Sequence, residues 1–128
     1  MTARAEVVPG RDMAIAAARA ANEKQANDVI ILEVAPIIAI TDYFVICSAS
    51  SQRHIKTVVE EIERALGALG EKPTRREGEG EGGWWLLDYI DVVVHVFGEE
   101  QRAYYELERL WLDAARVPWE AAGRASSG

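Results

Sequence analysis

The sequence predicts an α/β (α+β) fold with a single mixed β-sheet of about five strands and three helices. Helical patterns alternate with short runs of β-branched and aromatic residues, in the order helix, two strands, helix, three strands, helix. Neither an internal repeat nor a long linker divides the 128 residues. We therefore expect one domain over residues 1–120, followed by a disordered tail at 121–128.

The first half of the chain predicts a helix and two central strands. Residues 11–25 are rich in alanine, which favours a helix through propensity, and Asp12 is placed to cap it. Residues 29–34 and 43–48 are β-branched or aromatic runs separated by Pro36. These two runs predict strands near the centre of the sheet.

The second half begins with the clearest helical pattern. After the cap-like Ser50 and Ser51, apolar residues from 55 to 69 keep three-and-four spacing and end at Gly70. Residues 73–76 predict a short strand, 84–88 and 91–97 two further strands, and 99–115 a last helix.

The two aromatic strands predict a hairpin whose faces differ. A tight turn at Tyr89 and Ile90 places Asp88 opposite Asp91, Leu86 opposite Val93, and Trp84 opposite His95. Because side chains alternate between faces, one face is mixed and the other is apolar. The mixed face carries Trp84, Leu86, Asp88, Asp91, Val93, His95 and Phe97. The apolar face carries Trp85, Leu87, Val92, Val94 and Val96, and we expect it to lie under the helices, which leaves the mixed face for solvent or a partner.

Charge and composition restrict the functional classes. A formal net charge of −7 disfavours direct nucleic-acid readout and suits a basic protein partner. No apolar run approaches the ~20 residues of a membrane helix, and the N-terminal residues lack a secretory pattern, so we expect a cytoplasmic protein. The single cysteine, Cys47, lies in an apolar run and predicts a buried residue.

Several polar side chains of the hairpin have more than one interpretation. Asp88 and Asp91 fit a shared metal ion, turn stabilisation, or contact with a partner. His95 fits either a structural role stacked on Trp84 or a hydrogen bond to a partner, and it lacks a neighbouring nucleophile. We predict no metal, no cofactor and no catalytic residue.

Two flanking segments add candidate contacts. The acidic, glycine-rich segment 77–83 predicts a mobile loop in which Glu77 and Glu79 are available to a basic partner, since its glutamates would repel a phosphate. In the last helix, Tyr105 falls at the edge of the apolar stripe, where a tyrosine suits a binding interface.

Three motifs together resemble one known family. They are TDYFVI at residues 41–46, WWLLDYIDVVVHVF at 84–97 and RAYYELERLW at 102–111. The chain resembles the ribosomal silencing factor S family, also called Iojap, over residues 12–117. Two positions depart from the family pattern: Glu33 stands where aspartate is frequent, and Ile90 where glycine is frequent. At Ile90, either the turn needs no positive φ or a bulky side chain meets the partner.

The resemblance implies a translational repressor that binds the large ribosomal subunit through one basic ribosomal protein, number fourteen of that subunit. It then blocks joining of the small and large subunits. The family also assists large-subunit maturation in organelles, and its members are often homodimers when free. The resemblance implies a nucleotidyltransferase-like core, but the chain lacks the Gly-Ser and Asp-x-Asp pattern of that chemistry. The implied partner-binding residues are Trp84, Asp88, Tyr89, Asp91, His95 and Tyr105. The alternative is a nucleotidyltransferase-like, metal-dependent enzyme that uses Asp88 and Asp91.

Overall fold

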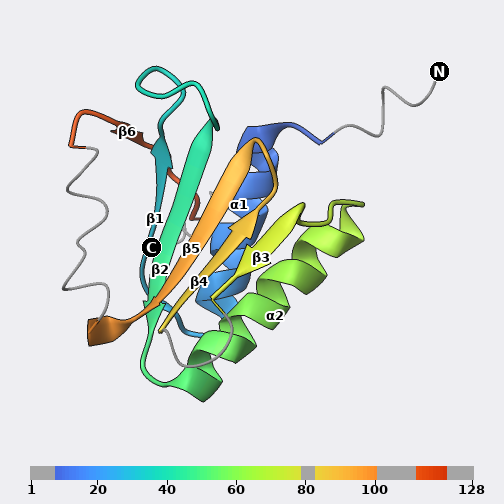
Figure 1. Ribbon diagram of the computed structural model, residues 1–128, viewed down its shortest axis with the longest axis vertical. Helices are drawn as coiled ribbons and strands as arrows, with labels where there is room; N and C mark the ends of the chain where they lie inside the picture. The colour runs from blue at the N-terminus through green and yellow to red at the C-terminus, as the bar shows by residue number, and fades with distance from the viewer. Residues whose placement is uncertain (1–7, 79–82, 101–111, 121–128) are drawn as a thin grey trace.

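The computed structural model describes residues 8–78, 83–100 and 112–120 (Figure 1). The elements within these ranges are α1 (Gly10–Glu23), β1 (Asn27–Glu33), β2 (Tyr43–Ala49), α2 (Gln52–Ala68), β3 (Arg75–Glu77), β4 (Trp84–Asp88), β5 (Val92–Gly98) and β6 (Ala115–Arg116). The strands form one sheet in the order β3-β4-β5-β2-β1-β6. β2 and β5 are parallel, and the other neighbours are antiparallel. The predicted single mixed sheet is confirmed, with six strands instead of about five.

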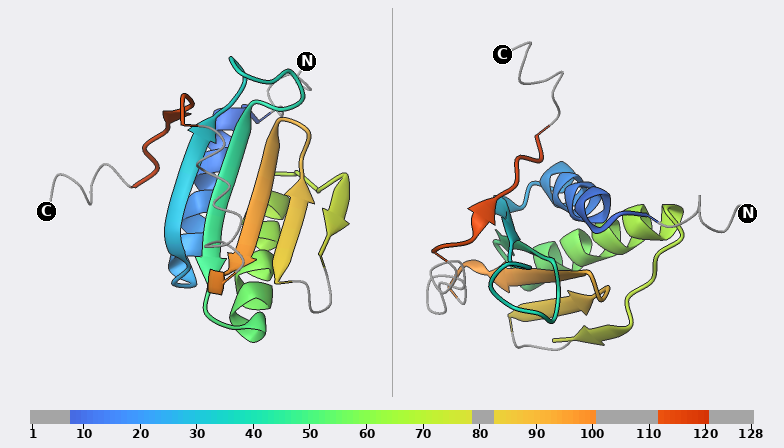
Figure 2. Two further views of the ribbon diagram at one scale, coloured as in Figure 1. Left: turned by 60° about the vertical axis from the view of Figure 1, so that its left-hand side comes forward. Right: turned by 90° about the horizontal axis from the view of Figure 1, so that it is seen from above.

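The helices α1 and α2 lie on one side of the sheet (Figure 2). The core between them and the sheet contains alanines of α1, branched residues of α2, and the residues of β4 and β5 that the alternation assigned to the apolar face. Leu87, Val92, Val94 and Val96 are fully buried there, and so is Cys47. The expected apolar face and the expected burial of Cys47 are therefore confirmed. Among the described residues, no helix has both the length and the apolar character that crossing a membrane requires.

The helix starts differ in how they are capped. Ser51 caps α2, because its side chain accepts a hydrogen bond from the His54 backbone N–H, as the sequence predicted. α1 begins at Gly10 after Pro9 and has no side-chain cap. The prediction that Asp12 caps α1 is wrong, since Asp12 lies inside the first turn, where its charge still suits the helix dipole.

The hairpin register differs from the prediction by two residues. Trp84 pairs with Phe97, Leu86 with His95, and Asp88 with Val93. The Tyr89 N–H donates to the Val92 carbonyl at 2.8 Å, so the turn residues are Ile90 and Asp91. The predicted turn at Tyr89 and Ile90 is wrong, and Asp88 and Asp91 are not cross-strand partners. A shift of two residues keeps the strand side chains on their faces, so the division into two faces survives. Asp91 is the exception, because it lies in the turn and not on the mixed face as predicted.

The predicted last helix, 99–115, is only partly within the described residues. Glu99 and Glu100 are helical, and residues 101–111 lie outside the described ranges. The predicted C-terminal end is wrong, because Ala115 and Arg116 form β6 against Glu33 and Leu32. The open edge of β1 supplies backbone partners there, and the Val117 N–H continues the pairing by donating to the Ile31 carbonyl at 2.9 Å.

The sheet face away from α1 and α2 has a small apolar core of its own. Its buried residues are Leu32, Val34, Ile46 and Phe97. His95 lies on this face and is 5% exposed. Trp84, Leu86 and Val93 are only half-buried. We expected the mixed face to be open to solvent or a partner. It has instead a buried centre and an accessible border along β3 and β4.

Candidate partner-binding surface

The accessible border of the mixed face is formed by β3, β4 and the turn that follows β4. Arg75 pairs with Asp88 and Glu77 pairs with Leu86 across the two strands, so these side chains share the face with Trp84. Ile90 and Asp91 form the turn at the end of these strands, both are exposed, and the Asp91 Cβ lies beside Gly10 at the start of α1. We call this set, Arg75, Glu77, Trp84, Leu86, Asp88, Ile90 and Asp91, the β3–β4 border.

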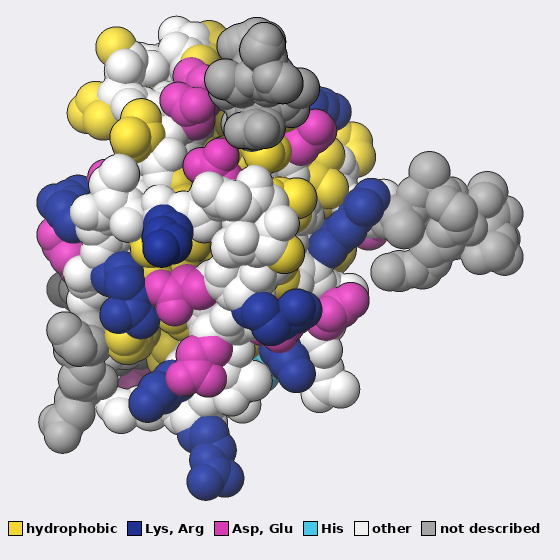
Figure 3. All heavy atoms as spheres, turned by 90° about the vertical axis from the view of Figure 1, so that its right-hand side faces the viewer, with side chains coloured by type: hydrophobic (Ala, Val, Ile, Leu, Met, Phe, Trp, Pro, Cys, Tyr) yellow, Lys and Arg dark blue, Asp and Glu magenta, His cyan; other side chains and the backbone are white. Residues whose placement is uncertain are grey.

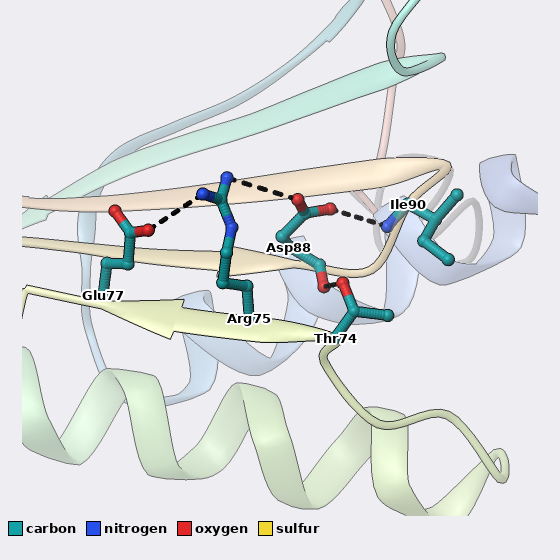
Figure 4. A network of polar contacts seen from close by, with 5 residues as sticks. All are labelled: Thr74, Arg75, Glu77, Asp88 and Ile90. Carbon is teal, nitrogen blue, oxygen red and sulfur yellow. Dashed lines mark hydrogen bonds and ion pairs between the residues drawn. The ribbon is translucent and has the colours of Figure 1, made fainter.

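A polar network orders the acidic side of the border (Figure 4). One oxygen of the Asp88 carboxylate accepts the Ile90 N–H at 2.8 Å, and the other lies 3.5 Å from Arg75 Nη2. Arg75 Nη1 also donates to Glu77 at 2.9 Å, and the backbone N–H and hydroxyl of Thr74 both donate to the Asp88 carbonyl. Asp88 thus stabilises the turn, one of its expected roles. Solvent-exposed ion pairs contribute at most about 1 kcal/mol, so a partner's cation can replace Arg75 at small cost.

Trp84 packs against an aromatic cluster on the same face of the sheet. The Trp84 indole N–H donates to His95 Nδ1 at 3.3 Å, and the Trp84 ring stacks on Phe97 with centroids 5.1 Å apart. The Phe44 ring meets His95 edge-on at 4.8 Å. Burial lowers the pKa of His95 to about 4, so its ring is neutral at pH 7. Within the described residues, its Nε2 has no hydrogen-bond partner. His95 therefore positions Trp84.

The other expected contact residues take different places. Tyr89 is 5% exposed and belongs to the core under the helices, where burial raises the pKa of its phenol. Asp91 is exposed, and its backbone carbonyl accepts the N–H groups of Asp42 and Tyr43 at 3.0 and 3.1 Å. Tyr105 and Glu79 lie outside the described residues. The structure brings Trp84, Asp88 and Glu77 onto one border, places Asp91 in the turn at its end beside Gly10 of α1, and places Tyr89 behind it.

A small hollow of about 120 Å³ opens beside Trp84. Its walls are Trp84 and Leu86, and Glu77 and Gly78 complete it. Gly78 has φ +109°, and a Cβ there would lie 1.9 Å from the Trp84 carbonyl oxygen. Glycine is therefore required at this position. Apolar walls with a carboxylate beside them suit the stem and charge of a lysine or arginine.

Ile90 is a residue for which the sequence left two alternatives open. It has φ +76° and is 60% exposed. A β-branched residue in this conformation is strained by roughly 1–3 kcal/mol. The expectation that the turn needs no positive φ is wrong. The other alternative, that a bulky side chain meets the partner, stays a prediction. The signal was present in the sequence as an isoleucine in a position where the family often has glycine.

The geometry gives no support to a metal site at Asp88 and Asp91. Asp88 is paired with Val93, and its carboxylate is engaged with the Ile90 N–H and Arg75. Across the described ranges, no group of three or more histidine, cysteine or acidic side chains is placed to hold a metal ion. The cross-strand carboxylate pair that the enzymatic alternative assumed is absent, because the turn lies one residue further along than predicted.

Comparison with known proteins settles the family. Residues 8–127 match the family model described as "Ribosomal silencing factor during starvation". The chain belongs to this family. The ribosomal silencing factor RsfS of Bacillus subtilis is 40% identical over 98 residues, which cover 77% of this chain and 83% of that protein. That of Halalkalibacterium halodurans is 38% identical over 104 residues, or 81% and 89% of the two chains.

Solved structures agree with the fold of this ribosomal silencing factor. A crystal structure of a protein from Bacillus halodurans superposes with TM-score 0.73 and 33% identity, over 84% of this chain and 98% of that one. The chloroplastic protein Iojap of Zea mays is 35% identical over 107 residues, although the match covers 45% of its length. The resemblance to the RsfS and Iojap family that the motifs indicated is therefore confirmed.

Proposed function

We propose that this chain binds the large ribosomal subunit through a basic ribosomal protein, number fourteen of that subunit, and sterically blocks joining of the small subunit. Family membership supports a role in silencing ribosomes. The observation that carries the proposal is the β3–β4 border, where half-buried Trp84 and Leu86 share a face with Glu77 and Asp88, and Asp91 lies in the turn at its end. Translation is repressed because the occupied surface is no longer available to the small subunit.

The chemistry of the border fits a basic protein. Tryptophan dominates binding hot spots because it buries a large area and also offers a polar atom. The three carboxylates outnumber the single guanidinium of Arg75, so the border is acidic, and complementary charge accelerates docking and excludes other partners. The hollow at Glu77 is shaped for one basic side chain of the partner.

Ile90 supplies the apolar tip of the contact. An exposed apolar side chain held in a strained backbone is costly to the free protein, and such strain is characteristic of functional sites. Burying its 60% exposed surface against a partner would recover hydrophobic free energy. Behind it, Tyr89 and His95 hold the turn and Trp84 in place. Tyr105, outside the described residues, remains a proposed contact.

Steric occlusion requires neither turnover nor a cofactor, and no direct readout of nucleic acid. We place this activity in the cytoplasm and propose a homodimer for the free protein. Light scattering after size-exclusion chromatography tests the dimer: the expected mass is twice 14.1 kDa, and a single monomer peak at micromolar concentration would contradict it.

Sedimentation with purified ribosomal subunits tests the proposed function. The protein should co-sediment with isolated large subunits, and it should reduce formation of joined ribosomes when small subunits are added afterwards. It should not bind ribosomes that are already joined, because the surface is then occupied. Equal binding to free and joined large subunits would refute occlusion.

A further inference from the structure

The helix side of the sheet carries a second feature, a basic pocket that the partner-binding surface does not use. The pocket has a volume of about 560 Å³ and lies between the start of α2 and strands β3 and β4. Arg53, Lys56 and Arg76 line it together with Ile55 and Trp85. Figure 3 shows lysine and arginine side chains gathered over the lower half of this face, with acidic side chains among them. Trp85 points away from Trp84, so the sheet separates this basic pocket from the β3–β4 border.

The basic pocket has cations near the N-terminus of α2, where the helix dipole disfavours positive charge. Arg53 is the second helical residue of α2 and Lys56 is the fifth, and the first turn contains no acidic residue. The helix dipole disfavours a cation at Arg53 by roughly 0.3–1 kcal/mol, and this effect falls off beyond the first turn. Among the described residues, neither side chain makes an ion pair or hydrogen bond. An anionic ligand would compensate these two cations, which lie near a helix N-terminus in a chain of net charge −7.

The third cation is partly engaged but still faces the pocket. Arg76 donates to Glu63 at 2.5 Å, and its guanidinium lies 5.1 Å from the centre of the Trp85 ring. These contacts fix the orientation of the guanidinium. Trp85 and the buried Ile55 give the pocket an apolar wall.

A smaller hollow of about 290 Å³ adjoins the basic pocket and shares Gln52, Ile55 and Gly83 with it. It lies where the parallel strands β2 and β5 end, at Ala49 and Gly98, which is where ligands bind in open α/β sheets. Ser50, Ser51, Glu99 and Glu100 surround it. Carboxylates there would repel a phosphate, but they accept hydrogen bonds from the hydroxyls of a sugar.

We propose that the two hollows together bind a nucleotide that carries at least two adjacent phosphates. The phosphates contact Arg53, Lys56 and Arg76, and the sugar lies towards Ser51 and Glu99. The volume of the basic pocket, about 560 Å³, is within the range of about 300–1,000 Å³ that is usual for small-molecule sites. A small anion interacts mainly with the nearby cations of the pocket. A longer nucleic acid would also be repelled by the overall negative charge of the protein, so a free nucleotide is favoured over RNA.

Isothermal titration of the full-length chain with ATP, GTP, pyrophosphate and adenosine tests this site. We expect saturable 1:1 binding of at least one nucleotide with a Kd of about 1 mM or below. Pyrophosphate should bind more weakly than that nucleotide, and adenosine should not bind at all. No saturable signal from either nucleotide at about 5 mM would overturn the proposal.

Matched variants locate the binding. Arg53→Ala with Lys56→Ala should weaken nucleotide binding by about tenfold or more, because two charge-assisted contacts are lost. Arg11→Ala with Lys72→Ala makes the same change in net charge at exposed positions outside the pocket, and it should leave the Kd within about twofold. All four side chains are exposed, so circular dichroism should be unchanged. An equal loss in both double variants, or tighter binding of a ten-nucleotide RNA than of any nucleotide, would overturn the assignment.

Discussion

His95 couples the stability of the fold to pH, and this coupling tests whether its imidazole is buried beneath Trp84. The ring is 5% exposed, and its folded-state pKa is lowered from 6.5 to about 4. Unfolding exposes the ring to water and returns its pKa to about 6.5. The unfolded chain therefore takes up a proton at a higher pH than the folded chain, and acid favours unfolding. The folded state keeps this part of its stability in full above the unfolded-state pKa of His95, and loses it as the pH falls from about 6.5 towards 4.

The size of the effect follows from these two pKa values. Between pH 7 and pH 5 the unfolded state gains a proton at His95 and the folded state remains almost entirely neutral, which costs about 2 kcal/mol of unfolding free energy. Substitution of His95→Asn removes the titration and keeps a side-chain oxygen near the position of Nδ1, where the Trp84 N–H donates. Other titrating groups are present in both proteins and cancel in the comparison.

Urea unfolding at pH 7 and pH 5 measures the difference. The wild-type chain should lose about 2 kcal/mol more than His95→Asn between these two pH values, whatever the stabilities at pH 7. Titration of the histidine ring protons by NMR gives an independent value of the pKa. The reasoning would be refuted by parallel pH dependences in the two proteins, or by a His95 pKa near 6.5.

Three further substitutions test other parts of the structure, each by urea unfolding. Ile90→Gly should be more stable than Ile90→Ala by about 1 kcal/mol, because both remove the side chain but only glycine tolerates φ +76° without strain; equal stabilities would argue against that backbone conformation. Gly78→Ala should destabilise the fold by more than about 2 kcal/mol, since its Cβ would collide with the Trp84 carbonyl, whereas Gly67→Ala, where nothing lies within 4 Å, should be neutral or stabilise α2; similar effects at both glycines would contradict the β3–β4 geometry. Ser51→Ala should cost about 1 kcal/mol through loss of the α2 cap, and an unchanged unfolding midpoint would show that the bond to the His54 N–H is dispensable.

The division of the hairpin into two faces was predictable from the sequence because it depends on alternation alone. Trp85 and Leu87 were assigned to the helix side and Trp84 to the other side, and the pairing agrees. The register was not predictable, since it depends on which residue adopts positive φ. Ile90 is an improbable choice for that conformation, so sequence rules placed the turn one residue too early.

The features that could not be predicted from the sequence depend on contacts between distant segments of the chain. β6 consists of two residues and exists because the edge of β1 is open, which no local propensity records. The burial of His95 depends on Phe44 of the neighbouring strand β2, and this neighbour becomes known only with the strand order. The basic pocket was missed for the same reason, because Arg76 and Arg53 are brought together by the packing of α2 beside β3 and β4.

Binding of the isolated large-subunit protein number fourteen to charge variants of the full-length chain tests the central claim most directly. Glu77→Lys with Asp91→Lys reverses two carboxylates of the β3–β4 border, and Glu23→Lys with Glu60→Lys reverses two exposed carboxylates on the helices. Binding should weaken by about a hundredfold or more in the first double variant and change by less than about threefold in the second. Equal affinities for the two double variants, with both folded, would contradict docking through the β3–β4 border.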